Sequence, residues 1–250
     1  MLADALRPVT QDPSAAGIFL DVDGTLAPIV ERAEDAQVPD ETRRALEALV
    51  PRYGCVACVS GRAAAEARRL VGVDGITYAG SHGAELLEPG ASEATVAPAF
   101  EEWAPRVREF VASHDTGELR VEHKGAIVAL HWRGAEQEEE RARKIAEDAN
   151  GFITHWGRKV LEIRPPVEVN KGQAVRELIR RHELQAALFA GDDATDLDAF
   201  AALDRIDLDA AVRVGVASDE GPAAIVEQAD LVVDGTEGFL VVLEALAEAG

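Results

Sequence analysis

The chain is poor in positive charge, and it has no long apolar run. Its 250 residues include 25 Lys and Arg against 46 Asp and Glu, a net charge of −21. Duplex nucleic acids and anionic membranes would repel such a chain, so we expect no nucleic acid and no membrane as partner. No stretch approaches membrane-spanning length, and residues 1–6 carry an acid and no apolar leader. We therefore expect a cytoplasmic protein.

Cysteine is also scarce. The two cysteines, Cys55 and Cys58, have a C-x-x-C spacing, which can mark a redox pair or half of a zinc site. They lie inside an apolar stretch, and there is no second cysteine pair to complete a zinc site. We interpret both as buried core residues.

Apolar runs and amphipathic stretches alternate at both ends of the chain. They predict strands over 17–23, 54–60, 75–80, 186–191, 212–217 and 230–233, and helices over 40–50, 62–71, 172–182, 196–203, 222–228 and 237–248. This alternation is typical of an α/β fold with a mostly parallel sheet and helices on both faces. A hydrophobic content of 47% suffices for a sizeable core.

The pattern changes in the middle of the chain. It predicts helices over 98–114, with a kink at Pro105, and 136–149, and strand hairpins over 118–133 and 152–164. This αββαββ order predicts an inserted α+β domain with its own antiparallel sheet. Turn-rich segments near both ends of this region suggest a core of 1–85 and 166–250 and an insert of 86–165.

Two aspartates, Asp21 and Asp23, directly follow the first predicted strand, in the sequence Asp-Val-Asp-Gly-Thr. Carboxylates at a buried strand end are costly unless a cation or a reaction needs them. The alternative is a polar turn, because Asp-Gly pairs are frequent in turns.

Three further motifs favour the functional interpretation. Ser60-Gly61-Arg62 follows the second strand, Asn170-Lys171-Gly172 opens a helix, and Asp192 to Asp196 follows the strand over 186–191. In an open parallel sheet, residues just past the strand ends converge on one crevice. Taken singly, Ser60 could be a helix N-cap, Lys171 a solvated residue, and Asp196 the cap of the helix near Thr195.

Together the four motifs resemble the haloacid dehalogenase (HAD) superfamily of phosphatases in order and spacing, over most of the chain. The resemblance implies a Rossmann-like, parallel-sheet HAD core with an inserted cap. It also implies that Asp21 is the nucleophile of an aspartyl-phosphate mechanism and that Asp23 is the general acid and then the base. Ser60 and the Gly61 amide would donate hydrogen bonds to the phosphoryl group, which Lys171 would neutralise.

A phosphate monoester would be repelled by so acidic a chain, so its binding requires placed basic residues or a metal. Hard oxygen ligands suit Mg²⁺. By the same resemblance, the Asp21 side chain, the Asp23 backbone carbonyl and Asp192 would bind it. Asp193 and Asp196 could hold metal-bound waters, orient Lys171 or cap a helix, with a metal role for Asp196 slightly favoured.

The segments that narrow the substrate are Ala79 to Glu85, Glu122-His123-Lys124, His131-Trp132-Arg133, Leu161 to Pro165 and Gly191 to Asp196. They resemble the family of trehalose-6-phosphate phosphatases. The resemblance implies substrate contacts from Gly61, Arg62, His82, Glu122, Lys124, His131, Arg133 and Glu162. One departure is that Leu197 follows Asp196, where that family usually has an acid.

Strand alternation supports the substrate contacts of the insert independently. It places Glu122 with Lys124, His131 with Arg133, and Glu162 with Arg164 on one face of the small sheet. The apolar side chains of the same strands point to the other face and would cover the helices. The alternative is an ordinary solvated sheet face.

Three functions remain open. One is a Mg²⁺-dependent, monomeric phosphatase of trehalose 6-phosphate, and another is a cap-bearing enzyme acting on a different sugar phosphate, such as sucrose phosphate, glucosylglycerol phosphate or a hexose phosphate. The last is a catalytically silent interaction protein that retains the fold. The intact set Asp21, Asp23, Ser60, Lys171 and Asp192 argues against silence.

Overall fold

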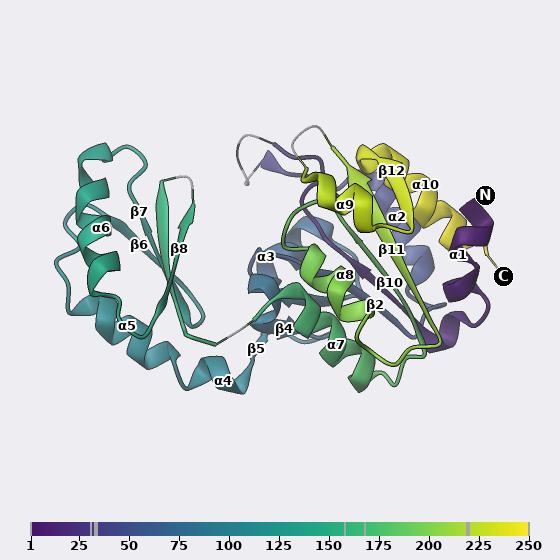
Figure 1. The fold of residues 1–250 in the computed structure, drawn as a ribbon, viewed down its shortest axis with the longest axis horizontal. Helices are drawn as coiled ribbons and strands as arrows, with labels where there is room; N and C mark the ends of the chain where they lie inside the picture. Colours follow the sequence, from purple (N-terminus) through teal and green to yellow (C-terminus); the bar gives the residue numbers. More distant parts are fainter. Residues whose placement is uncertain are drawn as a thin grey trace. The chain divides into compact units, whose positions relative to one another are not determined.

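The structure is a computed structural model that describes residues 2–30, 32, 35–157, 159–167, 169–218 and 221–249, with backbone only at 98 and 99. The chain divides into two compact units (Figure 1). The core unit comprises Met1–Thr95 and Val169–Gly250, and the cap unit comprises Val96–Glu168.

The core unit is built on an eight-stranded sheet in the order β12-β11-β10-β1-β2-β3-β4-β5. Its strands are β1 (Ala16–Leu20), β2 (Cys55–Val59), β3 (Thr77–Gly80), β4 (Glu85–Leu87), β5 (Thr95–Val96), β10 (Ala186–Gly191), β11 (Ala210–Ala217) and β12 (Leu231–Asp234). The pairs from β12 to β3 are parallel, and β4 runs antiparallel to β3. Because β4 and β5 extend this sheet, the core unit continues to Thr95.

Helices cover both faces of the core sheet. They are α1 (Leu2–Thr10), α2 (Asp40–Leu49), α3 (Ala64–Val71), α7 (Lys171–Arg181), α8 (Leu197–Leu203), α9 (Ala223–Gln228) and α10 (Gly235–Glu248). In β1, Ile18 and Leu20 join the hydrophobic cluster under α1, α2, α3 and α10, while Phe19 joins the cluster under α7, α8 and α9. This burial on both faces explains why β1 reads as a continuous apolar run.

The cap unit has a four-stranded antiparallel sheet in the order β6-β7-β9-β8. Its elements are α4 (Pro98–Glu101), α5 (Ala104–Ala112), β6 (Arg120–Lys124), β7 (Ile127–His131), α6 (Glu139–Asp148), β8 (Ile153–Gly157) and β9 (Val160–Arg164). Side chains from one sheet face, including Val128, Leu130 and Leu161, form a hydrophobic core with residues of α5 and α6. The predicted separation of apolar and polar faces is therefore confirmed within the strands, but the placement of Arg133 on a strand was wrong, because β7 ends at His131 and Arg133 lies in the turn after it.

Two parts of the sequence prediction were wrong. The helix expected over 98–114 is divided into α4 and α5, and Pro105 lies in the first turn of α5, where proline is tolerated, and not at a kink. Helix α1 was missed, although Leu6 and Val9 are fully buried on one side of it. Leu2, Leu6 and Val9 have the helical spacing i, i+4 and i+7, so the pattern could have found this helix, although Pro8 lies inside it.

The two cysteines are separate core residues. Cys55 belongs to the hydrophobic cluster on one face of the sheet and Cys58 to the cluster on the other. Both thiols are free and buried. Side chains on opposite faces of one strand cannot pair, so the redox and zinc interpretations are excluded for this pair.

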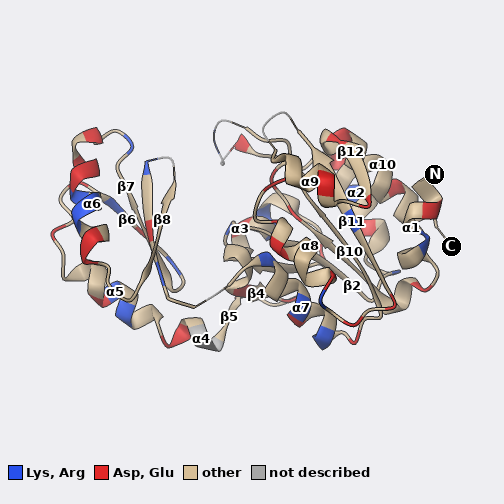
Figure 2. Cartoon of the chain, viewed as in Figure 1, with Lys and Arg blue, Asp and Glu red and all other residues tan. Residues whose placement is uncertain are grey.

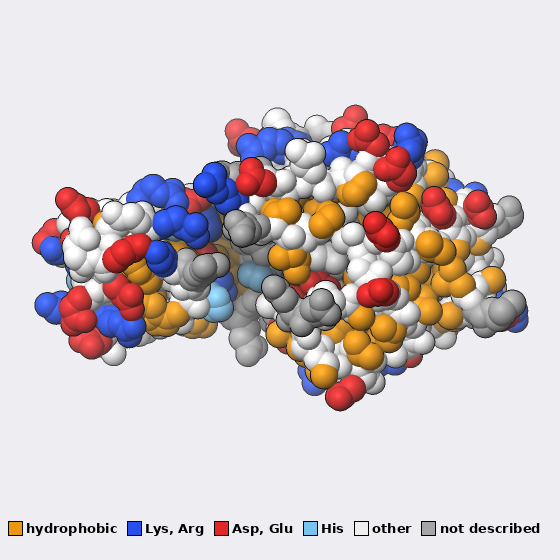
Figure 3. Space-filling model, turned by 90° about the horizontal axis from the view of Figure 1, so that it is seen from above, with side chains coloured by type: hydrophobic (Ala, Val, Ile, Leu, Met, Phe, Trp, Pro, Cys, Tyr) orange, Lys and Arg blue, Asp and Glu red, His pale blue; other side chains and the backbone are white. Residues whose placement is uncertain are grey.

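Acidic residues occur on helices of both units, among them α1, α2, α6 and α9 (Figure 2). On the face of the core unit that Figure 3 shows, charged side chains are interspersed among hydrophobic ones. Among the described residues, we find no helix that has both the length and the apolar character needed to cross a membrane.

Candidate active site

The parallel sheet brings the predicted carboxylates together at the ends of adjacent strands. Leu20 at the end of β1 pairs in register with Ala190 of β10, and the Asp21 amide donates to the Ala190 carbonyl at 2.9 Å. Asp21 and Asp192 therefore leave the sheet side by side. Neither strand continues past these residues, which lie at the carboxyl edge where α/β proteins bind ligands.

A buried lysine joins this carboxylate group. Lys171 Nζ donates to Asp21 Oδ1 and to Asp196 Oδ1, each at 2.7 Å, and lies 3.9 Å from Asp193 Oδ1. Lys171 is 2% exposed and Asp196 0%. The interpretation of Lys171 as a solvated residue was therefore wrong. Asn170 fixes its position by capping α7, because its side chain accepts the Gln173 amide at 2.9 Å.

Asp196 holds the loop after β10 together. Its Oδ2 accepts the amides of Asp192 and Asp193, at 2.9 and 3.0 Å, while its Oδ1 accepts from Lys171. Its side chain makes no capping bond to α8. The helix-cap interpretation was therefore wrong, and these contacts support the orientation of Lys171. Asp193 instead accepts the Thr195 amide and hydroxyl, at 2.8 and 2.7 Å.

Burial dominates the electrostatics of the cluster. Desolvation raises the pKa of Asp21 to about 7 against the lowering effect of Lys171, and it raises the pKa of Asp192 to about 6 with help from Asp196 and Asp193. The pKa of Asp196 is also raised by its burial. For Lys171, burial disfavours the charged form, but Asp21 and Asp196 outweigh it, so its pKa is raised.

This cluster is short of positive charge. Four carboxylates, from Asp21, Asp192, Asp193 and Asp196, face one ammonium, and oxygens of Asp21, Asp192 and Asp196 lie within 4.8 Å of one another. Such an all-oxygen donor set suits Mg²⁺ and offers no soft ligand for a thiophilic metal. A divalent cation would favour the charged forms of these carboxylates, whose pKa values burial and, to a smaller extent, mutual repulsion raise, so the residues present fit the ion.

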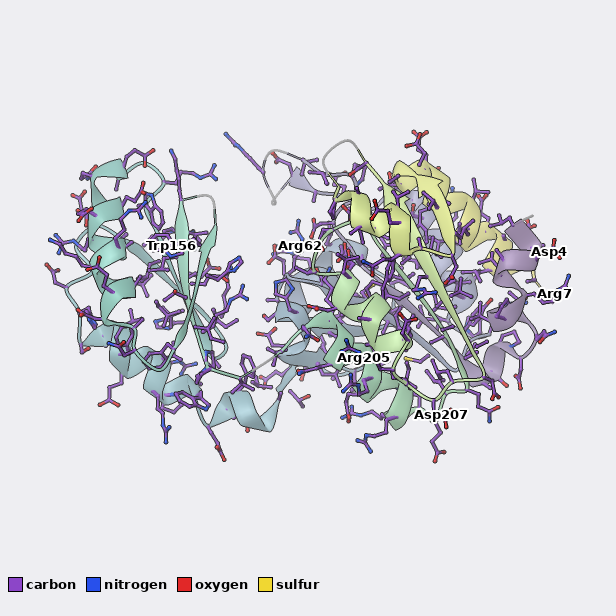
Figure 4. All side chains as sticks on the ribbon, viewed as in Figure 1. Asp4, Arg7, Arg62, Trp156, Arg205 and Asp207 are labelled. Atoms are coloured by element: carbon purple, nitrogen blue, oxygen red, sulfur yellow. The ribbon has the colours of Figure 1, made fainter. Side chains whose placement is uncertain are left out.

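Asp23 lies outside the lysine cluster and is held by Arg62. The Arg62 guanidinium donates to both Asp23 oxygens, from Nε at 2.7 Å and from Nη2 at 2.6 Å. Its Nη1 donates to Glu66 Oε1 on α3 at 2.8 Å. Arg62, labelled in Figure 4, is therefore a bidentate partner of the second motif aspartate. No sequence pattern indicates this ion pair.

The loop after β2 places Ser60 and Gly61 beside β3. The Ser60 amide donates to the Ala79 carbonyl at 2.9 Å, and Ser60 Oγ accepts the Arg62 amide at 3.2 Å. The N-cap interpretation of Ser60 was wrong, because α3 begins only at Ala64. The Ala64 amide donates to Glu85 Oε2 at 2.9 Å instead. Glu85 is thus a buried structural residue, to which sequence analysis assigned no role beyond its place in the segment Ala79 to Glu85.

Gly24 must be a glycine at this site. Its φ is +89°, a region that residues with a Cβ rarely adopt. A Cβ there would lie 2.1 Å from Asp192 Oδ2. The Asp-Gly pair therefore lets the loop after β1 pass directly over the Asp192 carboxylate, which also accepts from Thr25 Oγ1 at 3.3 Å.

In the cap unit, a row of paired residues crosses one sheet face, with polar members from three of the four strands. Glu122 of β6 pairs with Ala129 of β7, Ala129 with Glu162 of β9, and Glu162 with His155 of β8. Small Ala129 separates the two glutamates. His155, which sequence analysis did not select, lies on the same face.

A hydrogen bond and two ion pairs link residues on this face. His131 Nε2 and Glu122 Oε2 are 2.7 Å apart, Lys124 Nζ lies 3.5 Å from Glu162 Oε1, and Arg164 Nε donates to Glu162 Oε2 at 3.0 Å. Burial lowers the pKa of His131 against the effect of its bond to Glu122.

A hollow of about 250 Å³ adjoins these residues, lined by Glu118, Arg120, His131, Arg133, Ala135 and Lys159. Lys and Arg side chains are visible together on the cap unit in Figure 3, although the chain as a whole is strongly acidic.

The parallel sheet, its strand-end carboxylates and the inserted cap unit define a protein with a haloacid dehalogenase-like fold. A structure described as a haloacid dehalogenase-like hydrolase from Bacteroides thetaiotaomicron aligns with a TM-score of 0.65 and 14% identity, covering 92% of this chain and 98% of that one. A structure described as a trehalose-6-phosphate phosphatase related protein aligns with a TM-score of 0.67 and 26% identity, covering 92% and 96%.

The family follows from the sequence comparison. The trehalose-phosphatase family model matches residues 19–231, so the chain belongs to this family. It is 34% identical over 245 residues to a trehalose-phosphate phosphatase of Mycobacterium marinum, covering 90% of this chain and 62% of that protein. It is 37% identical over 202 residues to an uncharacterized glycosyl hydrolase of Mycobacterium tuberculosis, covering 74% of this chain and 15% of that protein. The chain thus spans less than two thirds of these relatives.

Proposed function

We propose that this chain is a Mg²⁺-dependent phosphatase that converts trehalose 6-phosphate to trehalose and phosphate. The observation that carries the proposal is the buried cluster of Lys171 with Asp21, Asp192 and Asp196, in a chain of the trehalose-phosphatase family. Charges so deeply buried are expensive to maintain for structure alone. They are frequent at catalytic sites.

The first chemical step uses one oxygen of Asp21. Lys171 occupies Oδ1, so Oδ2 is the oxygen that attacks phosphorus, and the bond from phosphorus to the sugar oxygen breaks. Asp23 gives the departing sugar oxygen its proton, which requires Arg62 to release one of the two Asp23 oxygens that it binds. This leaves an aspartyl-phosphate on Asp21 and free trehalose.

The second step returns the enzyme to its starting state. Asp23 takes a proton from a water molecule, whose oxygen attacks the phosphorus of the aspartyl-phosphate. The bond between phosphorus and Asp21 Oδ2 breaks, and phosphate leaves. Ser60 Oγ and the Gly61 amide donate hydrogen bonds to the phosphoryl oxygens during both steps.

Mg²⁺ would be held by Asp21, Asp192 and the main-chain carbonyl of Asp23, and it supplies charge neutralisation at the phosphoryl group. Asp196 was predicted as a further contributor to the metal site. Because both of its oxygens already accept hydrogen bonds, we propose that it contributes by fixing Lys171 and the loop that carries Asp192.

The cap unit would supply the sugar specificity. Glu122 and Glu162 accept hydrogen bonds from sugar hydroxyls, while Lys124, His131 and Arg133 donate to them. Arg62 and His82 of the core unit would contribute further contacts to the same substrate. Pairs such as His131–Glu122 are partly solvated, so they can exchange their present partners for hydroxyl groups.

The test is phosphate release by the purified chain, with Mg²⁺ and with excess EDTA, on a panel of trehalose 6-phosphate, sucrose 6-phosphate, glucosylglycerol phosphate, glucose 6-phosphate and p-nitrophenyl phosphate. We expect the highest kcat/KM for trehalose 6-phosphate and no turnover in EDTA. A preference for another sugar phosphate would reassign the substrate. Absence of turnover on the whole panel would favour a silent interaction protein.

We also infer a monomer in the cytoplasm, as the sequence predicts. The acidic surface supports a monomer through self-repulsion. Sedimentation analysis at physiological salt tests the oligomeric state.

A further inference from the structure

The turn between β3 and β4 contains three consecutive residues with left-handed backbone. The φ angles are +51° at Ser81, +59° at His82 and +104° at Gly83. Residues with a Cβ rarely adopt such angles, and two in succession are strained. The surrounding structure must therefore hold this turn in place.

Two hydrogen bonds join this turn to the loop after β2. The His82 amide donates to the Ser60 carbonyl at 2.9 Å, and the Ser81 amide donates to the Arg62 carbonyl at 2.7 Å. The strained residues thus bind the carbonyls on both sides of Gly61. The left-handed backbone at Ser81 sets the direction of the His82 amide, whereas the Ser81 amide follows the extended Gly80.

Peptide geometry then fixes the Gly61 amide. The peptide between Ser60 and Gly61 is planar and trans, so its C=O and N–H groups point in opposite directions. Because the Ser60 carbonyl points to His82, the Gly61 N–H points away from the turn. The Gly61 N–H can therefore donate to an acceptor outside the turn.

The His82 ring closes the remaining side of Gly61. A Cβ on Gly61 would lie 2.9 Å from His82 Cε1 and 3.0 Å from Nε2. The ring thus lies against the Gly61 Cα and leaves no room for a side chain.

The same turn packs against the helix that carries the buried lysine. A Cβ on Gly83 would lie 2.8 Å from the Ala174 Cβ of α7 and 3.4 Å from the carbonyl of Asn170, the residue before Lys171. One turn therefore contacts both the Ser60–Arg62 loop and the start of α7.

We propose that the turn Ser81–Gly83 is a positioning element that presents the Gly61 amide hydrogen to the phosphoryl group, with His82 as its main positioning residue. The inference rests on the proposed phosphatase function. Its physical basis is that a donor already aimed at the ligand needs no reorganisation when the ligand binds.

A single amide resonance can test this. Ser60-Gly61 is the only Ser-Gly pair in the sequence, so ¹³C-carbonyl serine with ¹⁵N-glycine gives one carbonyl-coupled amide signal, that of Gly61. The probe is tungstate, a tetrahedral oxyanion, titrated with Mg²⁺ present. In the wild-type protein we expect the Gly61 amide proton to move downfield as tungstate binds, because it gains a charge-assisted hydrogen bond.

Variants separate positioning from stability. His82→Val places a β-branched residue at the left-handed position, and we expect a smaller Gly61 shift and about tenfold weaker tungstate binding. Asparagine tolerates left-handed backbone, so the His82→Asn variant should show the wild-type shift. Glu183→Val is the matched control, because Glu183 also has a left-handed φ of +51° at the exposed end of α7. It should lose thermal stability without changing tungstate affinity.

A wild-type Gly61 amide that does not move at saturating tungstate would overturn the inference, even if the chain hydrolyses trehalose 6-phosphate. A folded His82→Val variant with wild-type affinity and shift would do the same. If His82→Val does not fold, the wild-type titration still decides. Tungstate binding with the expected shift, but no hydrolysis of any phosphate ester, would overturn the proposed function and leave the positioning inference standing.

Discussion

The core and cap units differ in how deeply they bury their paired charged side chains. In the core unit, the side chains of Lys171, Asp21 and Asp196 are 2%, 5% and 0% exposed, and they satisfy one another almost without water. In the cap unit, the side chains of Lys124 and Glu122 are 33% and 39% exposed. A buried charge cannot be replaced without leaving its partner unpaired, whereas a hydrated one can. The comparison suggests that the reaction is fixed in the core unit and that the cap unit can adapt to the substrate.

The largest expected effect comes from Asp21→Asn, which removes the nucleophile at nearly constant volume. We expect kcat to fall by about 10⁴-fold or more on every phosphate ester. Phosphate release measures this, and circular dichroism checks the fold. Asp40→Asn on α2 is the matched control, because that side chain is 80% exposed and pairs only with a neighbouring arginine among the contacts described. Wild-type turnover in Asp21→Asn would refute the mechanism.

Asp23→Asn should have a smaller effect that depends on the leaving group. Without proton donation we expect about 10²- to 10⁴-fold slower hydrolysis of trehalose 6-phosphate. The loss should be smaller for p-nitrophenyl phosphate, whose leaving group needs no proton. Equal losses on both substrates would assign Asp23 to binding and not to acid catalysis.

Removal of a cap glutamate should distinguish the role of the cap unit from that of the core unit most clearly. Glu122→Ala or Glu162→Ala leaves sugar hydroxyls unpaired, at about 1 to 3 kcal/mol each, so kcat/KM for trehalose 6-phosphate should fall by about tenfold or more. Hydrolysis of p-nitrophenyl phosphate should change little. Glu139→Ala on α6 serves as control, because Glu139 pairs with Arg143 on the same helix. Equal losses on both substrates would indicate a folding role for the cap glutamates.

The smallest effect concerns stability and pH. Burial raises the pKa of Glu162, but the bond from Arg164 and the charges of Arg164 and Lys124 outweigh it, and the net pKa is lowered below its ordinary 4.5. A lowered folded-state pKa adds stability above pH 4.5 that is lost as the pH falls through the folded value. Urea unfolding should therefore show Glu162→Gln less stable than wild type at pH 7, with the difference narrowing below pH 4.5. A constant difference at both pH values would contradict this.

Sequence reasoning located the site because its motifs are local. Asp21, Ser60 and Asp192 each follow an apolar run, and parallel topology alone brings such strand ends together. The cap faces were equally predictable, because alternation in β6, β7 and β9 has a period of two.

The parts of the site that sequence analysis did not predict are contacts between segments that are distant in the sequence. Glu85 meets the first amide of α3, and Arg62 meets Asp23, across 21 and 39 positions. No local pattern encodes such pairs, since each depends on how strands and helices pack. For Asp196, sequence analysis left a metal role, slightly favoured, and a helix cap open, whereas both oxygens of the buried side chain accept from Lys171 and the loop amides.

The placement of the two thiols has a consequence for following the motions of the core unit. Cys55 and Cys58 lie in hydrophobic clusters on opposite faces of one strand, and burial raises the pKa of Cys55 to about 12 and that of Cys58 as well. Neither thiol can react with an alkylating reagent until its own face opens. In single-cysteine proteins, each labelling rate would therefore report the opening of one helical layer. The chain thus carries separate kinetic reporters for the two sides of its sheet.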